Sequence, residues 1–169
     1  MTTNRPTTKV PFDRIVVEHG ATVLRVCRAI LGTIDADDAW SETFLSALRS
    51  YPKLPVDANV EAWLVTIAHR RAVDAIRASN RRATPYPDVG ESTAIAQVPT
   101  DEIDLEGLIG RLPEKQRMAV AYHYIAGLRY REVAEILGGS EAAVRRAGAD
   151  GIAAMRRAAA EYERSDEGA

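Results

Sequence analysis

Two arginines, Arg145 and Arg146, follow a glycine pair that separates two stretches of helical periodicity. Gly138 and Gly139 end the first stretch, because glycine accepts the left-handed backbone that closes a helix. Ser140 has the hydroxyl that caps the next helix by accepting a backbone amide hydrogen bond. Guanidinium groups early in such a second helix can contact phosphates and base edges. The spacing therefore predicts a DNA-binding helix-turn-helix.

Apolar residues on both sides of the glycine pair recur at the spacing of two packed helices. The apolar positions are Val133, Ala134, Ile136, Leu137, Val144, Ile152 and Met155. Arg129 and Arg131, before and within the first of these helices, are candidates for phosphate contacts. A plain helical hairpin has the same pattern, so the DNA-binding interpretation depends on the rest of the chain.

The net charge of −2 conceals two clusters of opposite charge. The acidic cluster consists of Asp35, Asp37, Asp38 and Glu42. The basic cluster consists of Arg70, Arg71, Arg77, Arg81 and Arg82, interrupted by Asp74. A net charge this close to zero argues against a protein that coats nucleic acid non-specifically. The local clusters instead predict two different partners, one basic and one acidic.

Composition excludes several classes of protein. The 169 residues contain no run of about 18 apolar residues, so no membrane span is expected. The single cysteine, Cys27, excludes an internal disulfide framework and fits a reducing compartment, so we expect a cytoplasmic protein. The sequence has no glycine-rich phosphate loop, no paired nucleophile and base, and no metal-ligand spacing among its histidines. We therefore expect neither an enzyme nor a metal or cofactor.

Strand signals are almost absent, so the sequence predicts an all-α fold made of two small helical modules. The modules are residues 12–82 and residues 101–160. Residues 83–100 between them are rich in proline and small polar residues, which is typical of a flexible linker. Pro113 suits the first turn of a helix in the second module, ahead of the helix-turn-helix.

Three helices are expected in the first module. The first ends at Gly32, and Gly20 lies where it could interrupt that helix. The second begins at Thr33 or Asp35, and the third ends in the basic cluster. The expected inner face of the second helix consists of Trp40, Phe44, Ala47 and Leu48.

Several segments, in their order along the chain, resemble extracytoplasmic-function (ECF) sigma factors of bacterial RNA polymerase, in the sigma-70 family. Residues 35–45 resemble their region 2.2 helix, and residues 59–77 resemble regions 2.3 and 2.4. Residues 112–117 and 127–137 resemble region 4. Each motif alone is weak, but their order and spacing across both modules is a strong signal. The resemblance implies an alternative sigma factor, a non-enzymatic subunit that directs core polymerase to specific promoters and assists promoter melting.

The resemblance implies that the acidic second helix docks on the clamp helices of the polymerase largest subunit. It also implies a contact between the second module and the β flap. The implied polymerase-binding residues are Asp35, Asp38, Ser41, Glu42 and Phe44. Phe44 is expected to pack this helix down, and the family usually has glutamine where this chain has Ser41. The alternative is that the acidic cluster is only the solvent-exposed start of a helix, where the helix dipole favours acidic residues.

The resemblance also implies that the loop at 53–60 and the helix after it bind the −10 promoter element and capture an unstacked base. The implied −10 residues are Asn59, Arg70, Arg71, Arg77, Arg81 and Arg82. An amide suits a base edge and guanidinium groups suit phosphates. The family usually has asparagine in place of Arg70. We expect Trp63 to lie in the core and His69 to be a surface histidine.

The second module would read the −35 element as duplex DNA through the major groove. The implied −35 residues are Arg129, Arg131, Ser140, Arg145 and Arg146. Family members usually continue the recognition helix with further basic residues, whereas here Gly148, Asp150 and Gly151 follow. Each glycine costs about 1 kcal/mol relative to alanine inside a helix, and Asp150 repels phosphate. We therefore expect the −35 contact to rest on the first turns of this helix.

Two other classes of protein remain open from the sequence. A sigma-like interaction module could bind an anti-sigma factor without productive DNA binding, which the atypical recognition helix favours. The arginine cluster argues against that class, because a module that never binds DNA needs no cations there. A free-standing helix-turn-helix regulator would leave the acidic helix and the tryptophan-bearing third helix unexplained.

Overall fold

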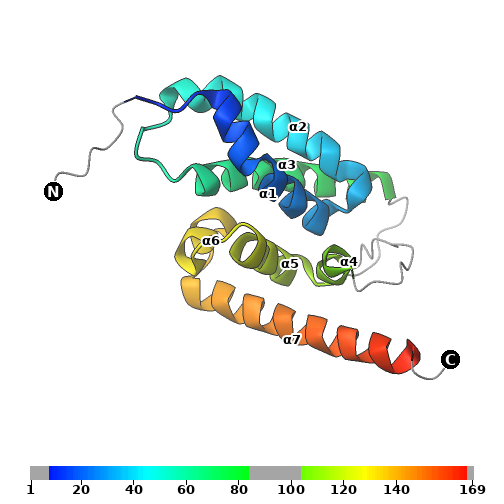
Figure 1. Cartoon of the computed structure of the whole chain (residues 1–169). Coiled ribbons are helices and arrows are strands. Elements are labelled where there is room, and N and C mark those ends of the chain that lie inside the picture. Colours follow the sequence, from blue (N-terminus) through cyan, green and yellow to red (C-terminus); the bar gives the residue numbers. More distant parts are fainter. Residues whose placement is uncertain (1–7, 84–103, 167–169) are drawn as a thin grey trace.

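The computed structural model describes residues 8–83 and 104–166, and both ranges are helical without any strand (Figure 1). The first range holds α1 (Phe12–Leu31), α2 (Thr33–Ser50), the 3-10 helix η1 (Tyr51–Lys53) and α3 (Val60–Ala83). The second holds α4 (Leu105–Gly110), α5 (Glu114–Val120), the π-helix η2 (Ala121–Ile125), α6 (Tyr130–Leu137) and α7 (Glu141–Asp166). The all-α prediction is confirmed for these ranges. The expected linker, apart from Ala83, lies outside the described residues.

Gly20 lies inside a continuous α1 and does not interrupt it. Its carbonyl oxygen accepts a hydrogen bond of 2.8 Å from Trp40 Nε1 on α2. A methyl group added at Gly20 would stand 3.5 Å from the Trp40 ring, so α1 and α2 are closely packed there. Gly32, with φ of 77°, ends α1 as expected and starts α2 in a new direction.

The inner face of α2 differs from the expected one at Leu48, which is 51% exposed. Phe44 is buried and packs against the Trp40 ring at a centroid separation of 4.8 Å. Thr43 and Ala47 are fully buried beside it, and the Thr43 hydroxyl is satisfied by the Ala39 carbonyl at 2.6 Å. Because Leu48 follows Ala47 by one residue, it lies about 100° further around the helix and faces outward.

The helix-turn-helix forms as the sequence predicts. Gly138 adopts the left-handed conformation, with φ of 73° and ψ of 36°, and ends α6. Ser140 Oγ accepts a hydrogen bond of 3.1 Å from the Ala143 amide and so caps α7. Val144 and Met155 are buried and hold α7 against the other helices.

The recognition helix α7 is continuous for 26 residues, even though its glycines disfavour a long helix. A Cβ atom on Gly151 would stand 2.7 Å from Val120 Cγ2 and 3.3 Å from Leu112 Cδ1. A Cβ atom on Gly148 would stand 3.2 Å from the Tyr130 ring. The two glycines therefore allow α7 to lie directly on α5 and on the start of α6. This close packing offsets their helix-propensity cost of about 1 kcal/mol each.

The two groups of helices pack against each other, which the sequence did not predict. Figure 1 shows α1 to α3 on one side of the molecule and α4 to α7 on the other, with α7 along the outer edge. α1 contacts α4, α5 and η2. One continuous hydrophobic core therefore includes residues of both groups, such as Val26 and Ile30 from α1 and Ile109, Val120 and Tyr122 from the second group.

Candidate nucleic-acid and polymerase interface

Four of the five arginines expected at the −10 element are exposed on α3. They are Arg70, Arg77, Arg81 and Arg82. Arg71, the fifth, is partly buried and donates a hydrogen bond of 2.6 Å from Nη2 to Ser46 Oγ on α2. Its guanidinium therefore ties α3 to α2, while the exposed members of the cluster extend along α3 to its C-terminal end.

Asn59 caps the opposite end of α3, and both ends of its amide have partners. Its Oδ1 accepts a hydrogen bond of 3.0 Å from the Ala62 amide, which fixes the start of the helix. Its Nδ2 donates to Glu132 Oε1 on α6 at 2.8 Å. The side chain expected to read a −10 base is thus exposed, oriented by the helix start, and hydrogen-bonded to the helix-turn-helix.

His69 is not the surface histidine that the sequence suggested. Its Nδ1 lies 2.9 Å from the hydroxyl of Tyr122, and the two rings meet edge to face. Tyr122 is fully buried, and burial raises the pKa of its hydroxyl far above the ordinary value. Burial also lowers the pKa of His69; the charge of Glu114 opposes this shift and that of Arg70 adds to it. The sequence carried no signal for this pair because its members are far apart in the chain.

The lowered pKa of His69 predicts that acid destabilises the fold. In the unfolded chain His69 regains its ordinary pKa of about 6.5, so below that pH the unfolded state binds a proton that the folded state resists. The stabilisation by neutral His69 is present above about pH 6.5 and is lost as pH falls through 6.5 towards the lower folded pKa. The slope is at most about 1.4 kcal/mol per pH unit.

The measurement is the free energy of unfolding of the parent and of His69→Gln between about pH 7 and pH 5. Glutamine keeps a hydrogen-bonding group near Tyr122 but does not titrate, and the carboxylates common to both proteins cancel in the difference. We expect the parent to lose stability relative to His69→Gln as the pH falls. A difference that stays constant with pH would show that His69 titrates normally.

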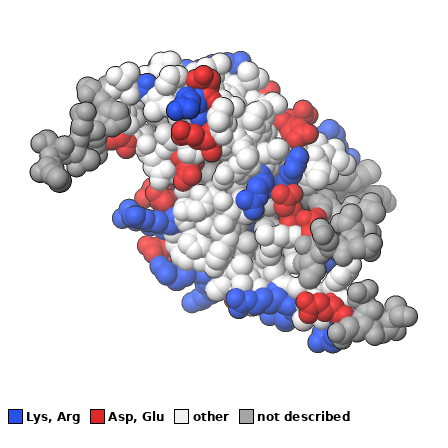
Figure 2. All heavy atoms as spheres, in the orientation of Figure 1, with Lys and Arg blue, Asp and Glu red and all other residues white. Residues whose placement is uncertain are grey.

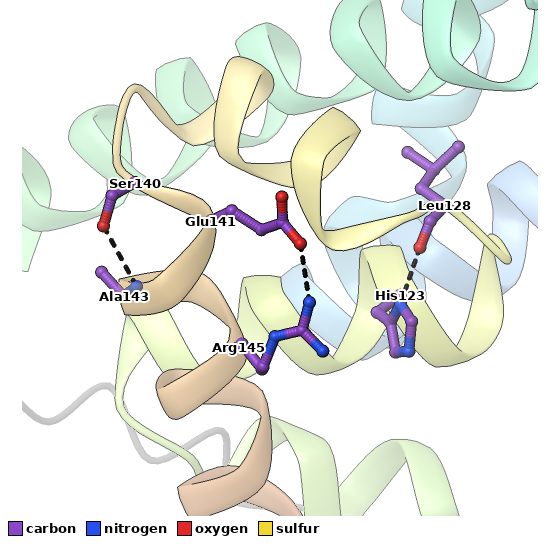
Figure 3. Close-up of polar contacts among 6 residues, drawn as sticks. All are labelled: His123, Leu128, Ser140, Glu141, Ala143 and Arg145. Carbon is purple, nitrogen blue, oxygen red and sulfur yellow. Dashed lines mark hydrogen bonds and ion pairs between the residues drawn. The ribbon is translucent and has the colours of Figure 1, made fainter.

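The start of α7 is held by polar contacts, which Figure 3 shows, and by aromatic contacts. Arg145 Nη2 pairs with Glu141 Oε1 at 2.6 Å. The Arg145 guanidinium also lies 5.0 Å from the centroid of the Tyr130 ring. The Tyr130 ring is also stacked on the ring of His123, with a centroid separation of 3.8 Å, and His123 Nδ1 lies 2.7 Å from the Leu128 carbonyl oxygen. Arg145 is therefore positioned over a rigid aromatic stack, although its exposed ion pair contributes little stability.

The remaining −35 candidates are all exposed near the turn. Arg129, Arg131 and Arg146 are exposed, and Ser140 serves as the cap of α7. The Arg129 amide donates to Glu132 Oε2 at 2.8 Å, which fixes the start of α6. Basic residues gather along the edge formed by α7 (Figure 2). Its exposed arginines are Arg145, Arg146, Arg156, Arg157 and Arg164, so the helix carries cations well beyond its first turns.

The acidic cluster lies on the solvent face of α2. Asp35, Asp38, Ser41 and Glu42 are exposed. Phe44 is only 6% exposed, so it holds α2 in place and does not itself face a partner. Three exposed apolar residues lie on the same helix; they are Ile34 and Leu45, which the sequence analysis did not single out, and Leu48, which it placed on the inner face. With Asp38 and Ser41 they form a stripe at helical spacing, hereafter the α2 stripe.

Other kinds of site find no support in the described residues. No group of histidine, cysteine and acidic side chains could hold a metal ion in residues 8–83 or 104–166. None of the described helices is both long and apolar enough to cross a membrane. Cys27 is buried in the core, and this burial raises the pKa of its thiol to about 12, so it is unsuited to nucleophilic chemistry.

Comparison with known proteins identifies the family. Residues 15–82 match Sigma-70 region 2, and residues 102–155 match Sigma-70, region 4. The ECF RNA polymerase sigma factor SigM of Mycobacterium tuberculosis is 33% identical over 137 residues, which cover 79% of this chain and 69% of SigM. BldN of Streptomyces coelicolor, another ECF sigma factor, is 29% identical over 145 residues, covering 79% of this chain and 54% of BldN.

Solved structures show the same fold. RpoE of Bartonella quintana, in complex with the anti-sigma factor NepR, has a TM-score of 0.71 at 17% identity. The match covers 86% of this chain and 94% of RpoE. CnrH, in complex with the cytosolic domain of CnrY, has a TM-score of 0.63 at 21% identity, covering 89% of this chain and 88% of CnrH.

The chain belongs to the extracytoplasmic-function sigma factors of the sigma-70 family. Sigma factors of this family are not enzymes; they bind RNA polymerase core and direct it to promoters. The alternative of a free-standing helix-turn-helix regulator is therefore rejected, because the first module matches Sigma-70 region 2.

Proposed function

We propose that this sigma factor divides promoter recognition between its two modules. The first module, with α2 and α3, docks on the clamp helices of the polymerase largest subunit and binds the −10 element during melting. The second module, with α6 and α7, reads the −35 element and contacts the β flap. The observation that carries the proposal is the capped and continuous α7 with exposed Arg145 and Arg146, paired in one chain with an exposed basic α3.

The −10 role rests on chemistry at both ends of α3. Melted DNA exposes a base edge and a string of phosphates, which call for an amide and for cations. Asn59 supplies an exposed amide at the start of the helix, and Arg70, Arg77 and Arg81 supply exposed guanidinium groups along it. Trp63 contacts Tyr51 at a ring separation of 6.1 Å and packs against the core, so it supports α3 instead of stacking on a base.

The −35 role rests on the first turns of α7. Helix-turn-helix proteins place the N-terminal residues of the second helix against base edges in the major groove. Arg145 and Arg146 lie there, and Arg129 and Arg131 flank the groove as phosphate contacts. Gly148 and Gly151 face the protein core, so they leave the DNA-facing side of α7 unchanged.

The docking role rests on the α2 stripe. This exposed helix face combines carboxylates with large apolar side chains. It therefore fits a partner surface that carries positive charges with apolar patches between them. Leu45 and Leu48 are about half exposed and Ile34 is 90% exposed, although each would be more stable out of water. We therefore assign Ile34, Leu45 and Leu48 to the polymerase contact together with Asp38 and Glu42.

Removing three cations from the end of α3 is expected to weaken promoter binding. In holoenzyme carrying Arg77→Ala, Arg81→Ala and Arg82→Ala, fewer counterions are released when DNA binds. The slope of log affinity against log salt should fall in magnitude by roughly 0.7 to 0.9 for each phosphate that is no longer neutralised. The measurement is a salt titration of holoenzyme–promoter affinity together with the yield of open complex.

The matched control removes the same number of exposed arginines elsewhere, in Arg14→Ala, Arg25→Ala and Arg111→Ala. This variant should keep the parental salt slope. Equal slopes and equal open-complex yields for all three proteins would mean that the end of α3 is only a solvated surface.

An anti-sigma factor is a further proposed partner. Two proteins of the same fold, RpoE and CnrH, were solved in complex with NepR and with the cytosolic domain of CnrY. The exposed apolar residues of α2 offer such a regulator a surface that it would share with polymerase. Competition between core polymerase and the regulator for the α2 stripe tests this partner.

A further inference from the structure

Lys9, which precedes α1, binds three backbone carbonyls where α2 and η1 end. Its ammonium group donates to the carbonyl oxygen of Tyr51, to that of Pro52 at 3.2 Å and to that of Leu54 at 2.6 Å. Figure 1 shows this part of the chain, in dark blue, beside the end of α2. A compact ammonium group with three donors suits three converging carbonyls, and a cation at a helix C-terminus is favoured by the helix dipole. Lys9 therefore satisfies a helix end that lies 42 residues further along the chain.

Tyr51 joins the Lys9 contact to the start of α3. Its ring lies 4.6 Å from Lys9 Nζ and 5.3 Å from the centroid of the Phe12 ring. Its hydroxyl donates a hydrogen bond to the Val10 carbonyl oxygen. The same ring lies 6.1 Å from the ring of Trp63, in the first turn of α3. The segment before α1 is thus fixed to the point from which the chain leaves α2 and turns towards α3.

The loop at 54–59 is fixed at both ends and exposed between them. At its start, the Leu54 carbonyl accepts from Lys9, and the Leu54 amide donates to the Tyr51 carbonyl at 3.0 Å. At its end, Asn59 caps α3. Residues 55–57 are exposed. The conformation of the loop therefore depends on how its two ends are held, because its middle has few packing contacts that could fix it.

Recognition of an unstacked base needs a site that is already in place. A loop that must first be ordered by its ligand lowers the affinity and weakens the discrimination between ligands. The proposed site for the unstacked −10 base consists of the loop at 54–59 and Asn59. The start of α3 holds Asn59, whereas Lys9 holds the other end of the loop.

We propose that Lys9 is a positioning residue for −10 recognition: its ammonium group holds the loop at 54–59 in the conformation that accepts an unstacked promoter base. This inference rests on the proposed −10 role of the first module. Lys9 acts through the loop and not through a phosphate, because its three donors already bind the carbonyls of Tyr51, Pro52 and Leu54.

The first test measures the loop in the free chain, without DNA or polymerase. Lys9→Met keeps a long apolar side chain but removes the charge and all three donors. We expect hydrogen exchange of the Leu54 amide, followed by NMR, to become at least about fivefold faster, because the carbonyls around it lose their cation. Exchange at Leu64, in the buried middle of α3, should stay as in the parent. Unchanged exchange at Leu54 would overturn the proposal.

The second test measures base preference in holoenzyme. Promoters that differ at one −10 position are compared by their yield of open complex. We expect Lys9→Met to lower the preference for the best base at the unstacked position at least about threefold, and Lys9→Arg, which keeps charge and donors, to restore part of it. The −35 preference and the salt slope should stay parental. An equal loss on all promoters would show a purely structural role, and a smaller salt slope would show a phosphate contact; either result overturns the proposal.

The matched control is Lys115→Met, which makes the same chemical change at an exposed position of α5. It should keep the parental exchange at Leu54 and the parental −10 preference, and equal effects of the two methionine variants would overturn the proposal. Asn59→Ala separates the two possible failures. If it alters −10 preference while Lys9→Met does not, only the role of Lys9 is rejected. If neither variant alters it, the proposed −10 role of the first module is rejected, and the role of Lys9 with it.

Discussion

Reversing two charges on α2, in Asp38→Lys with Glu42→Lys, is expected to lower the affinity for core polymerase at least about tenfold, or about 1.4 kcal/mol. Both side chains are exposed and lie beside the apolar members of the α2 stripe. Placing like charges against a basic partner surface is costly, whereas exposed substitutions change fold stability little. The measurement is a titration of labelled sigma factor with core polymerase, with the thermal midpoint of each variant recorded alongside.

The control for this experiment is Glu161→Lys with Glu163→Lys, which changes the net charge equally at the far end of α7. It should bind core polymerase within about twofold of the parent. If the α2 variant and this control bind alike, polymerase docks elsewhere and the exposed leucines of α2 need another explanation.

Substituting Gly151 is expected to destabilise the protein, although alanine is the better helix former. A methyl group there would lie 2.7 Å from Val120 Cγ2, and Val120 is buried and β-branched, so it has little freedom to move. Overpacking costs about 1–3 kcal/mol, and at a contact this short we expect the cost to outweigh the gain of about 1 kcal/mol in helix propensity. The free energy of unfolding of Gly151→Ala should therefore fall, and that of Gly151→Val should fall further.

The matched control is Gly110→Ala at the end of α4, where an added Cβ meets nothing within 4 Å. This variant should be neutral or more stable by up to about 1 kcal/mol. Denaturant unfolding followed by circular dichroism compares the three variants with the parent. A stabilised Gly151→Ala would mean that the glycine weakens α7 without serving its packing.

Local signals in the sequence were sufficient for the helices and for the turn between α6 and α7. Gly32 and Gly138 adopt positive φ at the predicted helix ends, and Ser140 caps α7, because these features depend only on neighbouring residues. The order of the motifs that resemble sigma regions 2 and 4 also follows from the sequence alone, and the family matches confirm it.

Properties that depend on distant contacts could not be predicted in this way. His69 looked like a surface residue because its partner, Tyr122, belongs to the other module. From the sequence, Gly151 was expected only to weaken the recognition helix. Its packing role could not be predicted, because Val120 comes close to it only when α5 and α7 pack together. Leu48 was assigned to the wrong face of α2 because small residues, not large ones, form the centre of its inner face. The roles of the individual site residues stay predictions.

The most direct test of the proposed division of promoter recognition between the two modules uses three holoenzymes that transcribe from a promoter library. The measurement is the base preference of each holoenzyme at every promoter position. The holoenzymes carry the parent, Asn59→Ala, or the double change Arg145→Ala with Arg146→Ala. We predict that Asn59→Ala alters preference only within the −10 element. The double change should relax preference only within the −35 element, at about 1–3 kcal/mol for each base that is no longer recognised. Parental preferences in both variants, or altered preferences in the opposite elements, would contradict the assignment of −10 recognition to α3 and of −35 recognition to α7.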